Sequence, residues 1–175
     1  GYSGGGKKMI AEFEDRQAEN FSDDPFRVYG LGLNHKHIPE ITKWSGLDHA
    51  PLFVPSIGRF RQGMIVQVPL QLWSLATAPG PEDVQKILAD HYAGQRFMNV
   101  LSMAETSAMN GLQPQGLNGT SEMHLHVFGK GDQAVVMGLV DNLGKGASGQ
   151  AVQNLNIMLG VPAHTGLDSG HMTLD

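Results

Sequence analysis

Cysteine is absent from the 175-residue sequence, which excludes disulfides, thiolate metal sites and cysteine nucleophiles within this chain. Basic residues are also few. The 12 Lys and Arg against 17 Asp and Glu give a formal net charge of −5, and no basic cluster is present, so we expect no nucleic-acid partner. No apolar run reaches the roughly 18 residues of a membrane span, and the N-terminal residues lack the apolar core of a signal peptide. We therefore expect a cytoplasmic protein with no membrane partner.

Enough apolar sequence is present for a core, because 41% of the residues are hydrophobic, which at this length suits one compact domain. The elements show no repeated βαβ rhythm, so the expected fold class is α+β, with a mixed, largely antiparallel sheet and helices on one face. This domain is expected over residues 1–162, and residues 163–175 are interpreted as an irregular tail of vector origin. The predicted helices are 7–21, 39–46, 80–94 and 147–160. The predicted strands are 26–37, 51–58, 63–73, 97–103, 122–129 and 133–142.

The segment LNHKHIPE, residues 33–40, carries His35 and His37 on one face of a predicted strand. Three interpretations remain open from the residues alone. A histidine oriented by Glu40 could act as an acid/base catalyst. The pair could bind a metal ion with further ligands such as Asp48, or it could be two polar groups at a strand end. An isolated H-x-H without cysteine is a weak metal motif, so we predict no metal site.

A second histidine pair alternates with apolar residues in the predicted strand 122–129. We interpret His124 and His126 as a face that meets solvent or an interface, rather than as a site.

Two glycine-rich segments precede predicted helices. In DNLGKGASGQAVQ, residues 141–153, glycines permit tight turns where free N–H groups, the helix dipole and Lys145 could bind an anion. The G-x-G-x-x-G spacing is only literal, because a dinucleotide fingerprint opens a βαβ unit and this helix is close to the end of the sequence. In GYSGGGKK, residues 1–8, Ser3 and the glycines could cradle an anion or form a flexible end. The alternative for residues 141–153 is a glycine-rich helix start that binds no ligand.

Taken in order, GYSGGGKK, HKHIPE and DNLGKGASGQAVQNLNIMLG resemble N-acetyl-gamma-glutamyl-phosphate reductase of arginine biosynthesis, in particular its shorter type. The resemblance runs from Gly1 to about Gly160, and LNGT and HVFGKGDQ fit the same stretch. The family is similar to aspartate-semialdehyde dehydrogenase and, more remotely, to the catalytic domain of glyceraldehyde-3-phosphate dehydrogenase. The resemblance implies a Rossmann domain that binds NADP and an α+β domain that carries substrate-binding groups and the subunit interface, like the C-terminal domain of glyceraldehyde-3-phosphate dehydrogenase.

The resemblance also implies a reaction. In these enzymes a cysteine thiolate attacks the acyl phosphate, phosphate leaves, and hydride from NADPH reduces the thioester to N-acetylglutamate 5-semialdehyde. The family's cysteine precedes the glycine loop, so this cysteine-free chain is expected to be an isolated C-terminal domain that is inactive alone. The expected partners of the parent enzyme are N-acetylglutamyl phosphate and further copies of itself, in a homodimer or homotetramer.

Carried onto this sequence, the resemblance assigns proton handling to His35 or His37, with Glu40 as the orienting carboxylate. Arg59 and Arg61 are candidates for the substrate's carboxylate or phosphate, since a guanidinium binds such groups bidentately; a solvated pair beside a strand is the alternative. The cofactor would be held mainly by the absent half, and nothing in this sequence distinguishes NADP from NAD. Two other classes stay open, a non-catalytic dimerising module and a metal hydrolase with histidine ligands. The residues expected to contact NADP are Ser3, Gly4, Gly5, Asn142, Leu143, Lys145 and Gly146.

Overall fold

The computed structural model describes residues 1–167. The chain divides into two compact units, Gly1–Arg61 and Gln62–Asp175, and each is described by itself. The single domain over residues 1–162 stays a prediction, and most of the predicted tail, residues 168–175, lies outside the described residues. None of the helices in the described part combines the length and apolar character needed to cross a membrane.

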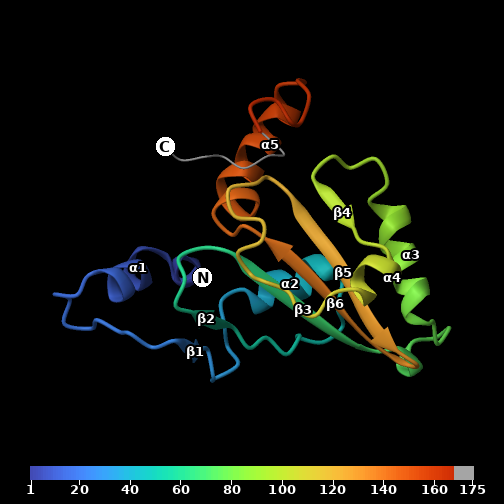
Figure 1. Cartoon of the computed structure of the whole chain (residues 1–175), viewed down its shortest axis with the longest axis horizontal. Coiled ribbons are helices and arrows are strands. Elements are labelled where there is room, and N and C mark those ends of the chain that lie inside the picture. The colour runs from blue at the N-terminus through green and yellow to red at the C-terminus, as the bar shows by residue number, and fades with distance from the viewer. Residues whose placement is uncertain (168–175) are drawn as a thin grey trace. The chain divides into compact units, whose positions relative to one another are not determined.

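The first unit holds a two-stranded antiparallel sheet and two α-helices (Figure 1). Its elements are the 3₁₀-helix η1 Tyr2–Gly5, α1 Gly6–Glu14, β1 Phe26–Val28, α2 Ile38–Ser45 and β2 Ser56–Gly58. Phe13 and Ile57 are buried, and the ring of Tyr2 stacks on Phe13 with centroids 5.1 Å apart. The Arg27 guanidinium lies over the Phe13 ring and binds the Glu12 carboxylate at 2.6 Å. This arginine therefore ties β1 to α1.

Helix α1 is shorter than predicted and ends at Glu14. Asp15 leaves the helical conformation with a ψ of 97°, and its carboxylate accepts a hydrogen bond from the backbone N–H of Gln17. An aspartate that binds the backbone two residues further on competes with continuation of a helix. The prediction of a helix over 7–21 was wrong beyond Glu14, because the spacing of apolar residues does not report this competition.

The second unit is built on a four-stranded sheet with the order β3-β6-β5-β4. Its elements are β3 Met64–Gln71, the 3₁₀-helix η2 Leu72–Ser74, α3 Pro81–His91, β4 Met98–Val100, α4 Met103–Ser107, β5 Met123–Lys130, β6 Gln133–Val140, the π-helical turn η3 Gly144–Ser148 and α5 Gly149–Met158. The pairs β3–β6 and β5–β6 are antiparallel, whereas β4–β5 is parallel. The sheet is therefore mixed and largely antiparallel, and the predicted α+β class is confirmed.

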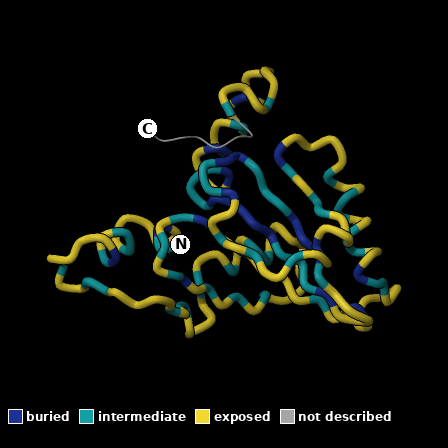
Figure 2. Tube along the Cα trace, in the orientation of Figure 1, coloured by how far each residue is buried: buried dark blue, intermediate teal, exposed yellow. Residues whose placement is uncertain are grey.

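Helices α3 and α4 pack on one face of this sheet (Figure 1). The buried centre consists of Leu72, Val127 and Ala134, and side chains of α3 and α4 close over it. Figure 2 shows burial concentrated along the central strands β5 and β6, while most residues of β3 are exposed. The helices therefore cover the middle of the sheet better than its β3 edge.

Several elements of the second unit begin and end at their local sequence signals. Helix α3 starts at Pro81, and the Asp83 carboxylate accepts the N–H of the preceding Gly80 at 2.8 Å. The β5–β6 hairpin turns through Gly131, whose φ of 62° suits glycine. Pro69 lies in the edge strand β3, where a missing N–H is tolerated. The predicted helix over 80–94 and the predicted strands over 63–73, 122–129 and 133–142 are thus present as α3, β3, β5 and β6.

The prediction that His124 and His126 lie on a face that meets solvent or an interface was wrong at His126. This side chain is only 2% exposed, its Nδ1 lies 3.3 Å from the carbonyl oxygen of Met137, and its ring stacks on Phe128. Burial lowers the pKa of His126; the hydrogen bond to Met137 opposes this effect, and the neighbouring His124 adds to it. Alternation along a strand shows which residues share a face, but not what covers that face.

Acid should destabilise the chain through His126. The unfolded side chain takes up a proton as the pH falls through its ordinary pKa near 6.5, while the folded side chain resists protonation until a lower pH. The unfolded state binds more protons in this window, so the free energy of unfolding falls with pH, by at most about 1.4 kcal/mol per pH unit for one group. Urea titrations at pH 7.5 and 5.5 should show a smaller loss of unfolding free energy for His126→Gln than for the wild type. An unchanged slope in His126→Gln would contradict the assignment.

Candidate functional site

The two histidines of HKHIPE lie in a turn. The predicted strand over 26–37 ends after three residues, so His35 and His37 do not share a strand face. Gly30 and Leu33 both have positive φ, 66° and 52°, and the N–H of Leu33 donates to the carbonyl of Gly30 at 3.0 Å. Two positive φ values reverse the chain, because an extended strand needs negative φ throughout. The strand prediction was wrong here for that reason.

His35 is packed among aromatic rings. Its ring centroid lies 6.1, 4.9 and 5.0 Å from those of Tyr29, His37 and Phe53. Its Nδ1 accepts the backbone N–H of His37 at 3.3 Å. A backbone N–H can only donate, so the neutral ring of His35 carries its own proton on Nε2. His35 therefore supports the turn and positions the backbone of His37.

His37 and Glu40 form an oriented pair. His37 Nδ1 lies 3.1 Å from Glu40 Oε2, and the two side chains are 50% and 68% exposed. Helix α2 creates this geometry, because His37 is its N-cap and Glu40 lies in its first turn. A carboxylate only accepts, so the shared proton sits on Nδ1 and the Nε2 lone pair points away from Glu40. Such an imidazole can take up or release a proton at Nε2.

The N-terminal glycine segment forms η1 and the start of α1. Ser3 is 5% exposed, and its N–H donates to the carbonyl oxygen of Arg61 at 3.0 Å. A Cβ on Gly5 would overlap Met9, whereas a Cβ on Gly4 would meet no heavy atom within 4 Å. A ligand could therefore approach the backbone at Gly4, while Gly5 is required by packing against α1.

Arg59 and Arg61 are both exposed. The Arg59 guanidinium carbon lies 5.9 Å from the ring centroid of Phe21. Arg61 Nε lies 3.7 Å from Glu14 Oε1 in an exposed pair, which contributes little. Each guanidinium offers five N–H donors, more than these contacts use, so both remain able to bind a carboxylate or phosphate.

Asp141 was missed by sequence reasoning, although its carboxylate organises the second glycine motif. It is 1% exposed. Oδ2 accepts from Gln62 Nε2 at 2.9 Å and from the N–H of Gly119 at 2.8 Å, and Oδ1 accepts from the N–H of Leu143 at 2.9 Å. Its backbone carbonyl accepts the N–H of Gly146 at 2.8 Å. One buried side chain thus joins the segment before β3, the loop before β5 and the turn after β6.

Hydrogen bonds hold three of the predicted cofactor residues in place, two of them through Asp141. Leu143 and Gly146 are bound by Asp141, and Asn142 Oδ1 accepts the N–H of Gly63 at 2.8 Å. The sequence signal for Asp141 is an aspartate at the end of an apolar strand and next to a glycine turn. Such a buried carboxylate requires several donors, but the donors come from distant segments and are not visible in the motif.

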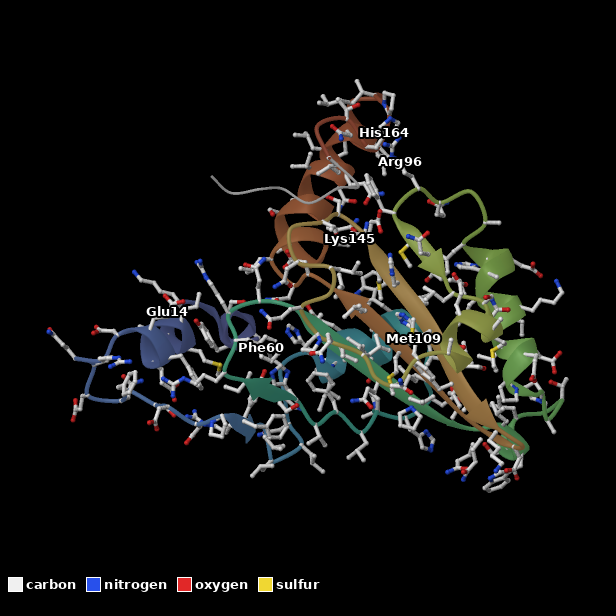
Figure 3. All side chains as sticks on the ribbon, in the orientation of Figure 1. Glu14, Phe60, Arg96, Met109, Lys145 and His164 are labelled. Atoms are coloured by element: carbon white, nitrogen blue, oxygen red, sulfur yellow. The ribbon has the colours of Figure 1, made fainter. Side chains whose placement is uncertain are left out.

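Lys145 lies near the start of α5 (Figure 3) and is 9% exposed. Its Nζ donates to Gln153 Oε1 at 2.5 Å and lies 5.7 Å from the ring centroid of Phe97. Burial lowers the pKa of Lys145. The ammonium has three N–H donors and Gln153 accepts from one of them, and the predicted contact of Lys145 with a cofactor stays a prediction.

Gly144 is packed too closely to carry a side chain. Its Cβ would lie 2.7 Å from the carbonyl oxygen of Thr120 and 3.0 Å from Asp141 Oδ2. We expect Gly144→Ala to lower the free energy of unfolding by about 1–3 kcal/mol through overpacking. Gly111→Ala is the matched control, because its Cβ would meet nothing within 4 Å, and it should change stability by less than about 0.5 kcal/mol. Equal urea midpoints for the two variants would refute the packing account.

The predicted cofactor residues differ in how much space they leave for a dinucleotide. Gly4 leaves its backbone open, which fits a close ligand approach. Gly146 offers no such space, since its Cβ would lie 3.2 Å from the carbonyl oxygen of Asp141, and closure of the turn explains this glycine. The structure brings His35, His37 and Glu40 together. It joins Leu143 and Gly146 to Asp141, holds Asn142 against Gly63, and links Ser3 to Arg61 through the backbone.

The described residues do not assemble a metal centre. Within residues 1–167, no three His, Asp or Glu side chains are grouped so that they could hold a metal ion. His124 Nε2 lies 2.9 Å from Glu122 Oε2 and 3.1 Å from Asn99 Nδ2. This histidine therefore has one carboxylate and one amide as neighbours. A metal hydrolase built on His35 and His37 would need its other ligands from outside this range.

Comparison with known proteins agrees with the resemblance in the motifs. N-acetyl-gamma-glutamyl-phosphate reductase 2 of Nostoc sp. is 45% identical to this chain over an alignment of 175 residues. The alignment covers 95% of this chain and 54% of that protein. The enzymes named N-acetyl-gamma-glutamyl-phosphate reductase in Brucella suis and Rhizobium leguminosarum are 48% identical over 162 and 161 residues, covering 91% of this chain and 52% of each protein. The chain spans about half the length of these curated relatives. A family model described as semialdehyde dehydrogenase, dimerisation domain, matches residues 1–142, and the chain therefore belongs to this family.

Proposed function

We propose that this chain is the C-terminal catalytic and dimerisation domain of an NADP-dependent reductase that converts N-acetyl-gamma-glutamyl phosphate to N-acetylglutamate 5-semialdehyde. The observation that carries the proposal is the match of more than nine-tenths of this chain, at 45–48% identity, to about half of relatives named for that activity. The description of the matching family as a dimerisation domain supports a second copy of the chain as a partner.

The chain by itself lacks one requirement of this reaction. Transfer of an acyl group from phosphate needs a good nucleophile that is also a good leaving group, which is the role of a thiolate, and the sequence has no cysteine. The thiol would come from the part of the enzyme outside this chain. The domain alone is therefore expected to be inactive, and its contribution is to handle protons and to bind the substrate.

His37 is the residue we assign to proton handling. Glu40 holds its Nδ1–H, so Nε2 is the atom that can accept the thiol proton during acyl transfer and return a proton during reduction. His35 is assigned a positioning role, since its Nδ1 already accepts the His37 N–H and its ring is packed against Phe53. This division of roles could not be drawn from the H-x-H spacing.

The other proposed contacts are to anions and cofactor. Arg59 and Arg61 would bind the substrate's carboxylate or phosphate, and the exposure of both side chains supports this role. Ser3, Gly4 and Gly5 would meet NADP, with the open backbone at Gly4 as support. Bound NADPH would supply the hydride. The predicted contacts in the second unit are Asn142, Leu143, Lys145 and Gly146.

The test is an assay of the full-length protein that contains this chain. N-acetylglutamate 5-semialdehyde, NADP⁺ and inorganic phosphate should together give NADPH, and omission of phosphate should abolish the signal. Replacing NADP⁺ with NAD⁺ in a parallel assay would establish cofactor preference. A folded full-length protein without this activity would overturn the proposal and favour a non-catalytic dimerising module.

A further inference from the structure

A pocket in the second unit contains polar side chains that the proposed reaction does not use. Its lining residues are Asn99, Val100, Leu101, Glu105 and His124. They come from β4, the segment that follows it, α4 and β5. The pocket has a volume of about 250 Å³, which at about 30 Å³ per water molecule corresponds to roughly eight waters. It shares no residue with the proposed acid/base pair of the first unit.

His124 is held at this pocket by a carboxylate. Its Nε2 lies 2.9 Å from Glu122 Oε2, and the two side chains are only 25% and 18% exposed. A carboxylate only accepts, so the neutral ring carries its proton on Nε2 and has an acceptor lone pair at Nδ1. Asn99 Nδ2 donates to the same Glu122 oxygen at 3.3 Å. Within residues 1–167, His124 Nδ1 and Asn99 Oδ1 accept no hydrogen bond, so both can accept from a ligand.

Glu105 adds a negative charge to the same pocket. Its Oε2 accepts the hydroxyl of Ser102 at 2.7 Å and the backbone N–H of Ser102 at 2.8 Å. These bonds lower the pKa of Glu105, the bond from the hydroxyl more than the bond from the backbone, so the carboxyl group is ionised at neutral pH. They also fix the side chain at the start of α4. The second oxygen, Oε1, accepts no hydrogen bond in the described part of the chain.

This combination of acceptors and charge determines which ligand suits the pocket. A primary ammonium group has three N–H donors, no acceptor and one positive charge, which complements Glu105, His124 and Asn99. Val100 and Leu101 add apolar surface that suits a short alkyl chain. An anion is disfavoured, because none of the described lining residues is a lysine or arginine. A metal ion is disfavoured too, since no three His, Asp or Glu side chains within residues 1–167 are grouped to hold one.

We propose that this pocket binds a short primary alkylammonium ion, whose ammonium donates to Glu105, His124 and Asn99 and whose alkyl chain contacts Val100 and Leu101. The site goes beyond the proposed function, because no step assigned to the reductase uses these residues. A hydrogen bond to an ionised carboxylate is stronger than one to a neutral acceptor, so Glu105 supplies the largest part of the affinity. A ligand with so few heavy atoms should bind with a dissociation constant in the millimolar range.

Titration with propylammonium chloride tests the site. In the full-length protein that contains this chain, with isotope-labelled histidine, the ring signals of His124 should shift in a saturable manner by NMR. Their absence from the spectrum of His124→Gln assigns them. Tetramethylammonium carries the charge without N–H donors, and n-propanol has the same alkyl chain without the charge. Neither should shift the His124 signals at the concentration that saturates the shift with propylammonium.

Substitutions identify the contacts. Glu105→Gln keeps an acceptor for Ser102, as glutamine does in a capping box, but removes the charge and should weaken propylammonium binding by about tenfold or more. Asn99→Leu lies outside α4 and should weaken it by about threefold to tenfold. Asp90→Asn is the matched control, because it removes the same charge from an exposed pair with Lys86, and it should keep the wild-type affinity.

The outcomes separate a built site from general attraction between charges. Circular dichroism checks that each variant is folded. The proposed site would be overturned if propylammonium gave no saturable shift of the His124 signals in the wild type, or if tetramethylammonium gave the same shift. It would also be overturned if Glu105→Gln and Asn99→Leu both kept the wild-type affinity, or if Asp90→Asn weakened binding as much as Glu105→Gln.

Discussion

Replacing His37 by asparagine should lower kcat of the full-length reductase by roughly 10²- to 10⁴-fold, the usual effect of removing a general acid/base group. The expectation follows from the pair with Glu40, which fixes the proton on Nδ1 and leaves Nε2 to exchange protons with the reacting groups. The KM for the acyl phosphate should change little, because His37 is assigned no role in holding the substrate. Steady-state kinetics in both reaction directions would measure the two constants separately.

His35 provides the control, because it belongs to the same turn but is assigned a positioning role. His35→Phe keeps an aromatic ring among Tyr29, His37 and Phe53 but removes the acceptor for the His37 N–H. We expect a loss of about tenfold in kcat, well below that of His37→Asn. If His35→Phe were the slower variant, or if both retained the wild-type rate, the assignment of acid/base chemistry to His37 would be wrong.

Asp141→Ala should lower the free energy of unfolding of the chain by about 4 kcal/mol. Its carboxylate accepts hydrogen bonds from Gln62 Nε2 and from the N–H groups of Gly119 and Leu143, and each buried donor left without an acceptor costs about 1–3 kcal/mol. Water that enters the space left by the carboxylate can accept from some of these donors, which reduces the total cost. Urea unfolding monitored by circular dichroism measures the change.

Asp141→Asn distinguishes the loss of hydrogen-bond acceptors from the loss of side-chain volume. Asparagine fills the same volume but presents an N–H where one carboxylate oxygen stood, so we expect about half of the alanine effect. Asp90→Ala removes an exposed carboxylate that pairs with Lys86 and should change stability by less than about 1 kcal/mol. Should Asp141→Ala unfold at the same urea concentration as Asp90→Ala, the three hydrogen bonds would not be organising the unit.

Local chemistry made part of this fold predictable. Pro39 lies in the first turn of α2 and Gly46 caps its C-terminus, Pro81 begins α3, and Gly131 lies in the hairpin turn. Proline fixes its own φ and glycine permits a positive φ, so the effect of each residue is local and does not depend on distant contacts. The α+β class followed from the order of such elements.

The missed features depend on contacts that a local pattern does not contain. Leu33 adopts a φ of 52°, which a leucine adopts rarely. The neighbouring residues in the sequence do not predict this positive φ. His126 looked exposed because its strand alternates, yet tertiary packing buries it. The partners of Asp141 include Gln62, 79 positions away in the sequence. Likewise, the spacing of His35 and His37 placed both near Glu40, and the different hydrogen bonds of the two rings are the basis for the separate roles that we propose.

The strand order β3-β6-β5-β4 separates fast from slow steps of assembly. Strands β5 and β6 are joined by a tight turn and can pair within microseconds, as hairpins do. Strand β3 reaches β6 only after closing a much longer loop, and such non-local pairing slows folding. Until β3 has paired, the free edge of β6 can bind β3 of another chain in the same register as its own β3. At high protein concentration this vacancy favours strand exchange between chains, a route to domain-swapped assemblies.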